Sequence, residues 1–339
     1  MPLFVGLDVS QNETAIAIVD ETGRRVLETA VSTDPNAVTG VFDRLHRRFE
    51  RVGLEAGMLS QWLHNGIKAH GYPVVCIENQ RMHKFASASP GKTDRSDAMA
   101  IAQAMRAGLY RPVHVKSEWA LQVRTLLVHR RKLLHQAQDL ERMLRGTLKT
   151  FGLRIGPVTA KNFPSRVADL LRQAPALEAI VEPVVKARRH LVDLGMTLHR
   201  LAKAAAKAKV EAMRLMTVPG VGPITALAFV ATIDDPARFK RSREIGAHLG
   251  LVPRLHESGE VSWRGRVTRH GDIMLRRQLF LAARSHIVNY RGETDIGRWG
   301  RALWERRGFR RAMVAVSRKL SVVLLAMWRD RTEFRPKIA

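Results

Sequence analysis

The chain has 339 residues, enough for two or three domains that each bury a core, and its apolar content of 45% is ordinary for a folded protein. The single cysteine, Cys76, excludes an internal disulfide and any cysteine-based zinc cluster. The 57 Lys and Arg residues exceed the 31 Asp and Glu residues and give a net charge of +26, which favours a polyanionic partner, above all nucleic acid.

Charge divides the chain into two parts. Residues 1–115 hold 13 Lys and Arg against 12 Asp and Glu, whereas residues 116–339 hold 44 against 19. This distribution suggests chemistry in the first part and binding of a polyanion in the second. An anionic membrane is the competing partner, but the sequence has no lipidation motif and no run of eighteen apolar residues. We therefore expect a cytoplasmic, bacterial protein with no membrane partner.

The first 115 residues alternate between strand and helix patterns. Three apolar runs with strand-forming residues come first, and a turn at residues 20–23 joins the second to the third, which predicts an antiparallel meander. A helix, a short strand, a second helix, a fifth strand and a third helix follow. The predicted strands are 3–9, 14–19, 26–31, one ending near Glu55, and 72–77; the predicted helices are 36–48, one through 59–67, and 95–106. This uncommon order predicts an RNase H-like (RuvC-like) α/β domain over residues 1–115.

Residues 116–212 carry two heptad patterns. The first has apolar residues at seven-residue spacing, with Arg130 interrupting the line, and the second is longer and more regular. A segment rich in Gly and Pro, residues 152–175, separates them. The predicted seam positions are Val123, Leu126, Leu133, Ala137, Leu140 and Leu144 in the first, and Val184, Ala187, Leu191, Leu194, Leu198, Leu201, Ala205 and Ala208 in the second. These patterns predict a coiled-coil arm whose helices pair within one chain or between two chains.

Residues 213–339 form the third predicted domain, which is basic, mainly α-helical and rich in short motifs. The three predicted domains are therefore 1–115, 116–212 and 213–339.

Four carboxylates occupy positions where an RNase H-like fold brings side chains together. Asp8 lies within an apolar strand, where a charge has to be paired, hydrated or bound to metal, and Glu55 ends the fourth strand. Asp94 and Asp97 are three residues apart at the start of a helix, so both point to one face. Hard oxygen ligands of this kind suit two Mg²⁺ ions, for which Mn²⁺ can substitute, in phosphoryl transfer.

Each carboxylate also has a simpler interpretation when taken alone. Asp94 is typical of a helix N-terminus, Glu55 of a solvated strand end, and Asp8 of a paired structural residue. Glu78, after the fifth strand, is a rival for the place of Glu55. Only the combination in these topological positions favours metal binding.

Several segments resemble the DEDD transposases of bacterial insertion sequences, in order and over nearly the whole chain. The first group is residues 5–10 (VGLDVS), 53–57 (GLEAG) and 92–98 (KTDRSDA), and the second is residues 216–226 (MTVPGVGPITA), 249–253 (LGLVP) and the stretch from Glu257 to Arg276. The resemblance implies a RuvC-like domain joined to a C-terminal domain that supplies a nucleophilic serine. It also implies recombination guided by a bridge RNA.

By this resemblance, Asp8, Glu55, Asp94 and Asp97 match the metal-binding quartet and Ser258 matches the serine that attacks DNA. Taken alone, Ser258 beside Gly259 is an ordinary turn residue, and the nearby Ser262 is a second candidate. The expected partners are donor and target DNA, a guide RNA, and further copies of the chain in a dimer or tetramer.

Two motifs in the third domain predict contacts with nucleic acid. Gly220 and Gly222 lie in a PGVGP segment that resembles a helix-hairpin-helix turn, where backbone amides approach a phosphate, although a plain tight turn fits as well. A basic patch adjoins Ser258, and its position favours phosphate contact over a merely solvated face. The patch consists of Arg264, Arg266, Arg269, His270, Arg276 and Arg277.

Two other functions compete with the transposase prediction. A hydrolytic, junction-cleaving nuclease would use the same carboxylates without a covalent intermediate. A nucleic-acid-binding protein without catalytic activity would retain the carboxylates for structural reasons only.

Overall fold

The computed structural model of the chain describes residues 1–79, 94–258, 261–289 and 294–335. Within this range the contacts divide the chain into two units, Met1–Lys116 and Ser117–Ala339. The predicted boundary at residue 115 lies beside this division, and the predicted boundary at residue 212 stays a prediction. No described helix combines the length and the hydropathy that crossing a bilayer requires.

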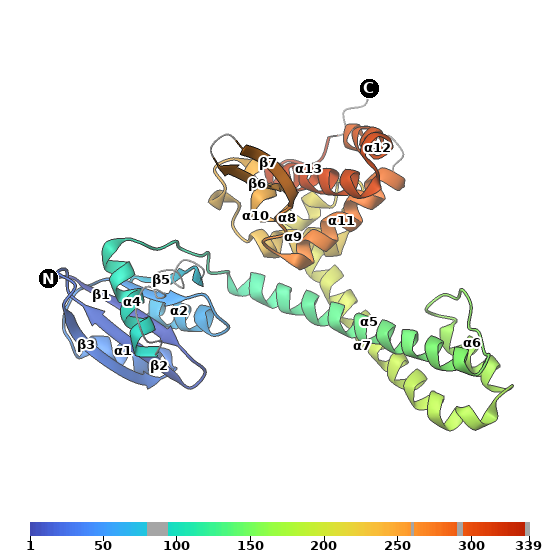
Figure 1. Cartoon of the computed structure of the whole chain (residues 1–339), viewed down its shortest axis with the longest axis horizontal. Helices are drawn as coiled ribbons and strands as arrows, with labels where there is room; N and C mark the ends of the chain where they lie inside the picture. Colours follow the sequence, from blue (N-terminus) through green and yellow to red (C-terminus); the bar gives the residue numbers. More distant parts are fainter. Residues whose placement is uncertain (80–93, 259–260, 290–293, 336–339) are drawn as a thin grey trace. The chain divides into compact units, whose positions relative to one another are not determined.

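The first unit contains a mixed five-stranded sheet, which confirms the predicted α/β start and is consistent with an RNase H-like domain (Figure 1). The strand order is β3-β2-β1-β4-β5; β1, β2 and β3 pair antiparallel, whereas β4 and β5 run parallel to β1. The elements are β1 (Leu3–Val9), β2 (Glu13–Val19), β3 (Arg25–Ser32), α1 (Pro35–Asp43), β4 (Phe49–Glu55), α2 (Ser60–Ala69), β5 (Val74–Ile77) and α4 (Asp94–Ala107).

Alternation along β1 sends its side chains to two different cores. Leu3, Val5 and Leu7 pack with α1 and α2 on one face of the sheet, and Phe4 packs with α4 on the other face. The sheet is therefore the middle of three layers, and α4 alone covers β1, β2 and β4 from its side among the described helices.

Two predicted segments extend two or more residues beyond the observed elements. The helix expected over residues 36–48 ends at Asp43, and it begins where the Asp34 carboxylate accepts from the backbone amides of Asn36 and Ala37, with Pro35 in the first turn. The strand expected over residues 72–77 begins only at Val74, two residues after Tyr72.

The second unit is mainly helical, as predicted. Two long helices, α5 (Glu118–Thr150) and α7 (Glu178–Ala208), lie side by side, with α6 (Phe163–Leu171) at the end where they are joined (Figure 1). The start of α5 and the end of α7 contribute to the core of the following helices. These later elements are α8 (Val210–Leu215), α9 (Pro223–Ile233), α10 (Ile245–His248), β6 (Pro253–Ser258), β7 (Val261–Val267), α11 (Ile273–Val288), α12 (Asp295–Arg307) and α13 (Phe309–Asp330).

The predicted seam positions of α5 are all buried or partly buried, whereas half of those of α7 are exposed. Leu194 and Leu201 are 41% and 53% exposed, and Ala187 and Ala208 are exposed as well. The fully buried heptad line of α7 instead runs through Val181, Arg188, Gly195 and Ala202. A regular coiled coil along these helices stays a prediction.

Two residues of the buried line explain why apolar spacing pointed to the wrong positions. Arg188 is buried because its guanidinium lies 2.9 Å from the Glu141 carboxylate and 4.5 Å from the Phe163 ring centroid. Gly195 is buried because Leu134 of α5 packs against it; a Cβ at residue 195 would lie 2.6 Å from a Leu134 methyl group. A heptad pattern that is recognised from apolar residues alone does not place an Arg or a Gly among the buried positions of a helix.

Candidate active site

Asp8 and Glu55 lie next to each other at the carboxyl ends of two parallel strands. The register pairs Gly6 with Gly53 and Leu7 with Leu54, so Asp8 and Glu55 occupy the next position on each strand. Both line a pocket of about 520 Å³, together with residues that include Ser10, Ser60 and Asn79. The structure therefore brings these two predicted carboxylates together.

Helix α4 covers the face of the sheet to which Gly6 belongs, and its first turn lies towards the strand ends that carry Asp8 and Glu55. Near the start of β4, Arg51 donates to the carbonyl oxygen of Met105, late in α4, at 3.0 Å. Further along the sheet, Gly6 lies under Ala98, early in the helix. The helix thus runs opposite to β1 and β4, and its first turn, with Asp94 and Asp97, lies towards their carboxyl ends.

The four carboxylates differ in exposure and do not all converge. Asp94 is exposed, whereas Asp8, Glu55 and Asp97 are partly buried. Across the part of the chain that the structure describes, no group of three or more His, Cys, Asp or Glu side chains is placed to hold one metal ion. Residues 80–93, which lead into α4, lie outside the described range.

Two residues that follow β5 have different roles. The Glu78 carboxylate, the rival for Glu55, pairs with Arg111 at 3.7 Å, and its amide donates to the Arg111 carbonyl. Asn79 lines the pocket of Asp8 and Glu55, and its Oδ1 is buried without a hydrogen-bond donor among the described residues. Sequence reasoning missed Asn79, although its position just past a parallel strand was a usable signal.

The donor set of this pocket fits a hard divalent cation. Asp8 and Glu55 contribute carboxylate oxygens, and Asn79 contributes an amide oxygen that lacks a donor. Oxygen ligands of these two kinds are those that Mg²⁺ and Mn²⁺ take in proteins.

Ser258 ends strand β6 in the second unit. Its backbone pairs with Val261 across the β6–β7 hairpin, and its side chain lies outside what the structure describes. Ser262, the second candidate, is exposed and pairs with Glu257. The predicted nucleophile and the predicted metal ligands therefore belong to different units of the chain.

The basic patch contains exposed residues and one buried residue. Arg266, Arg269, His270 and Arg277 are exposed, and the side chain of Arg264 lies outside the described part. Arg276 is buried; its guanidinium donates to the carbonyl oxygens of Leu249 and His270, and burial lowers its pKa. Arg276 thus ties α11 to the preceding loops, and we leave it out of any surface that binds nucleic acid.

The two glycines of the PGVGP turn are used differently. Gly220 has a φ of +81° and packs against α11, where a Cβ would lie 2.9 Å from the Ala282 carbonyl oxygen. Gly222 is exposed immediately before α9, with no atom within 4 Å of the place of a Cβ. Of the two, only Gly222 lies open at a helix N-terminus.

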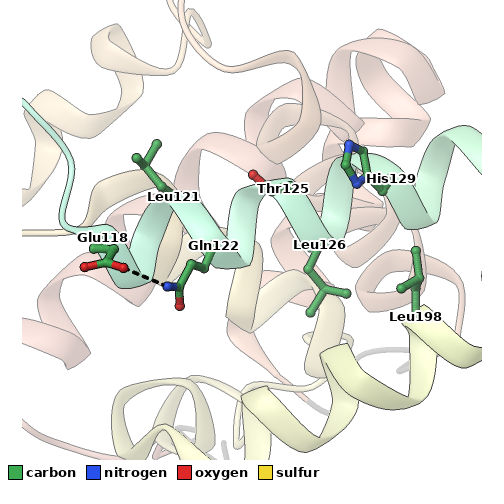
Figure 2. Close-up of a pocket in the computed structure, with 7 residues that line it drawn as sticks. All are labelled: Glu118, Leu121, Gln122, Thr125, Leu126, His129 and Leu198. Atoms are coloured by element: carbon green, nitrogen blue, oxygen red, sulfur yellow. Dashed lines mark hydrogen bonds between the residues drawn. The ribbon is translucent and has the colours of Figure 1, made fainter. Parts of the chain in front are cut away.

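A second pocket, of about 450 Å³, lies between α5 and α7 (Figure 2). Figure 2 shows Leu121, Leu126 and Leu198 along it, and the Glu118 carboxylate accepts from Gln122 at 3.1 Å. Its lining is mainly apolar and lacks a convergent set of catalytic groups, so we do not treat it as an active site.

Comparison with known proteins gives consistent matches along the chain. A family model described as "Transposase", of the DEDD type, matches residues 5–152, and one described as "Transposase IS116/IS110/IS902 family" matches residues 212–296. The chain is 30% identical to the transposase for insertion sequence element IS1111A of Coxiella burnetii, over 98% of this chain and 91% of that protein. It is 29% identical to a probable family 20 transposase of Pseudomonas aeruginosa, over 84% and 86%. It is 22% identical to an uncharacterized 43.6 kDa protein of insertion element IS110 of Streptomyces coelicolor, over 99% and 96%.

Proposed function

We propose a composite active site for this chain, which belongs to the IS116/IS110/IS902 family of insertion-sequence transposases. Carboxylates of the first unit would hold divalent metal, and Ser258 of the second unit would attack DNA. The two parts would meet within one chain or between two copies of it. The proposed reaction is metal-dependent cleavage and exchange of DNA strands.

The observation that carries the metal half is the shared pocket of Asp8 and Glu55 at the carboxyl ends of β1 and β4, the ends towards which the first turn of α4 lies. Asp8 and Glu55 would hold the cation, with Asp94 and Asp97 contributing from the helix. When bound, Mg²⁺ or Mn²⁺ would neutralise charge that develops on the phosphodiester oxygens. The carboxylates would also fix where the DNA backbone can approach.

The serine half rests on the family resemblance around residues 257–276 and on the position of Ser258 at the end of a hairpin strand. The serine Oγ would form a bond to phosphorus while the bond from phosphorus to the leaving sugar oxygen breaks. The serine proton would pass to a base, and the leaving oxygen would take up a proton. The resulting phosphoserine link conserves the bond energy until another DNA end reverses the step.

Exposed basic side chains of the second unit support DNA and RNA as partners. Arg266, Arg269, His270 and Arg277 follow the proposed nucleophile closely in sequence and would contact phosphates. We further propose that a bridge RNA selects donor and target DNA by base pairing. Joining two DNA segments would require at least a dimer, and a tetramer is the expected assembly.

Trapping a covalent adduct between protein and DNA tests this proposal. Full-length protein, Mg²⁺, the candidate RNA and labelled donor DNA should give an adduct whose phosphoserine maps to Ser258. Ser258→Ala should abolish it, and Ser262→Ala should retain it. Cleavage by Ser258→Ala without an adduct would instead establish a hydrolytic nuclease. Strand exchange by Asp8→Asn at saturating Mg²⁺ would contradict the metal half.

A further inference from the structure

We infer that Asn79 is a further ligand of the divalent cation in the carboxylate pocket, beyond the four acidic residues of the DEDD pattern. The inference rests on the proposed function of that pocket. It concerns one amide side chain and the cation that Asp8 and Glu55 would share with it.

Sheet topology places Asn79 beside the two carboxylates. Strand β5 runs parallel to β4 and pairs Ile77 with Glu55, and Asn79 follows Ile77 by two residues. Ile77 packs into the core beneath α4, on the same face of the sheet as Gly6. Asp8 and Glu55, at the carboxyl ends of β1 and β4, and Asn79, just past β5, thus lie at one edge of three neighbouring parallel strands and line one pocket.

The amide oxygen of Asn79 is exceptional among the buried polar atoms. Only Asn79 Oδ1 and Thr268 Oγ1 are buried without a hydrogen-bond partner among the side chains that the structure describes. Elsewhere in the same pocket, the Ser60 hydroxyl donates to the Gly57 carbonyl at 2.8 Å and accepts from the Gly57 amide at 3.0 Å. An acceptor that stays buried without a donor is unfavourable, so its retention calls for a compensating ligand.

The chemistry of the pocket selects a cation as that ligand. The side chains of Asp8 and Glu55 present carboxylate oxygens, and Asn79 adds a carbonyl-type oxygen. These three oxygens would repel a phosphate or a carboxylate, whereas all three attract a divalent cation. The adjacent acid, Glu78, pairs with Arg111, so we assign the further cation ligand to Asn79 and not to Glu78. An amide also adds a ligand without adding repulsive negative charge beside two carboxylates.

Direct measurement of Mn²⁺ binding tests the inference without relying on activity. The dissociation constant is measured by calorimetry, and free Mn²⁺ by electron paramagnetic resonance, on the full-length protein without nucleic acid. Asn79→Ala should weaken Mn²⁺ binding about tenfold, the scale on which removal of a supporting group weakens metal sites. Asn79→Asp, which restores an oxygen at the same place, should recover binding. The matched control is Asn65→Ala, which removes an exposed asparagine of α2.

Asp8→Asn separates failure of the inference from failure of the proposed function. Loss of Mn²⁺ binding in Asp8→Asn with wild-type binding in Asn79→Ala overturns the role of Asn79 alone. Wild-type binding in both variants, or no binding by the unaltered protein, overturns the metal pocket and the inference together. If Asn79→Ala melts below the temperature of measurement, Asn79→Asp and Asn79→Ser decide, because both retain a side-chain oxygen. Weakened binding in these two, with an unchanged melting temperature in both, contradicts the inference.

Discussion

Gly6 of β1 lies directly beneath Ala98 of α4, where a Cβ at residue 6 would be 2.0 Å from the Ala98 carbonyl oxygen and 2.4 Å from the Ala102 amide nitrogen. Both neighbours are backbone atoms and cannot rotate away. Helix α4 therefore rests on the sheet at a distance that only glycine permits. That distance also fixes how closely the first turn of the helix approaches the carboxylate pocket.

We accordingly expect Gly6→Ala to destabilise the first unit, by about 1–3 kcal/mol, the usual cost of overpacking a core. It should also weaken Mn²⁺ binding, since α4 has to move away from β1. Urea unfolding and calorimetry check the two effects. Gly40→Ala is the matched control, because a Cβ at residue 40 of α1 meets no atom within 4 Å. That substitution should stabilise the helix by roughly 0.5–1 kcal/mol, and equal effects of the two variants would contradict the packing argument.

Removal of the guanidinium should lower the stability of the protein at Arg276 but weaken DNA binding at the adjacent Arg277. Arg277 is exposed, so Arg277→Ala should leave unfolding unchanged, weaken DNA binding and lower the salt dependence of the binding constant by about one ion. Arg276→Met leaves the buried Leu249 carbonyl and the partly buried His270 carbonyl without this donor. It should cost about 2 kcal/mol or more of stability. Fluorescence anisotropy across a salt series measures DNA binding, and thermal melts measure stability. A loss of stability in Arg277→Ala, with unchanged stability and weakened DNA binding in Arg276→Met, would contradict the assignment.

The sheet of the first unit could be predicted because its strands carry local signals. Strand β1 is an apolar run, and a turn containing Gly23, whose φ is +87°, joins β2 to β3. The sequence order of these strands also restricts the possible topologies. The face of α7 could not be predicted in the same way. Its interior line contains Arg188 and Gly195, whose burial depends on Glu141, Phe163 and Leu134 of other elements.

In the candidate site, too, features that depend on contacts with other elements could not be predicted from the sequence. Asp8 and Glu55 could be predicted together because the order of strands and helices predicts that β1 and β4 are parallel neighbours, whose carboxyl ends lie at one edge of the sheet. Arg276 was misjudged because a basic residue beside a basic patch suggests exposure, while its actual partners are the backbone carbonyls of Leu249 and His270, 27 and six residues away in sequence. The position of Asn79 just past a parallel strand was a signal that sequence reasoning did not use, whereas its unsatisfied amide oxygen is a property of packing that a sequence does not show.

The two residues of the Arg188–Glu141 ion pair, which joins α7 to α5, should differ in how much stability is lost when each is replaced. The Arg188 side chain is 4% exposed, and Glu141 also accepts from Arg145 at 3.0 Å. Glu141→Gln leaves a buried arginine without a counter-charge and should cost about 3 kcal/mol. Arg188→Met leaves Glu141 with Arg145 and should cost less, and the double variant should recover part of the loss. Hydrogen exchange of amides in residues 141–188 reports on the part of the helices around this ion pair; equal losses in the two single variants would count against this difference.

His286 should make the second unit sensitive to mild acid. The side chain is fully buried; one ring nitrogen lies 2.8 Å from the Pro219 carbonyl oxygen, and the other is hydrogen-bonded to the Thr294 hydroxyl. Burial lowers the pKa of His286 below its ordinary value of 6.5, although the bond to Pro219 acts in the opposite direction. The neutral ring fits this arrangement, since Nδ1–H donates to Pro219 and Nε2 accepts from Thr294.

The sign of the pH dependence follows from which state binds more protons. As the pH falls below about 6.5, the unfolded chain protonates residue 286 while the folded chain does not. The stability contributed by the neutral ring is therefore complete above this pH. It is lost progressively on acidification until the lowered pKa of the folded state is reached. Thermal melts of the unaltered protein should show this decline, and His286→Gln should be less stable at neutral pH but flatter across the window. An equally steep decline in His286→Gln would assign the acid sensitivity to other groups.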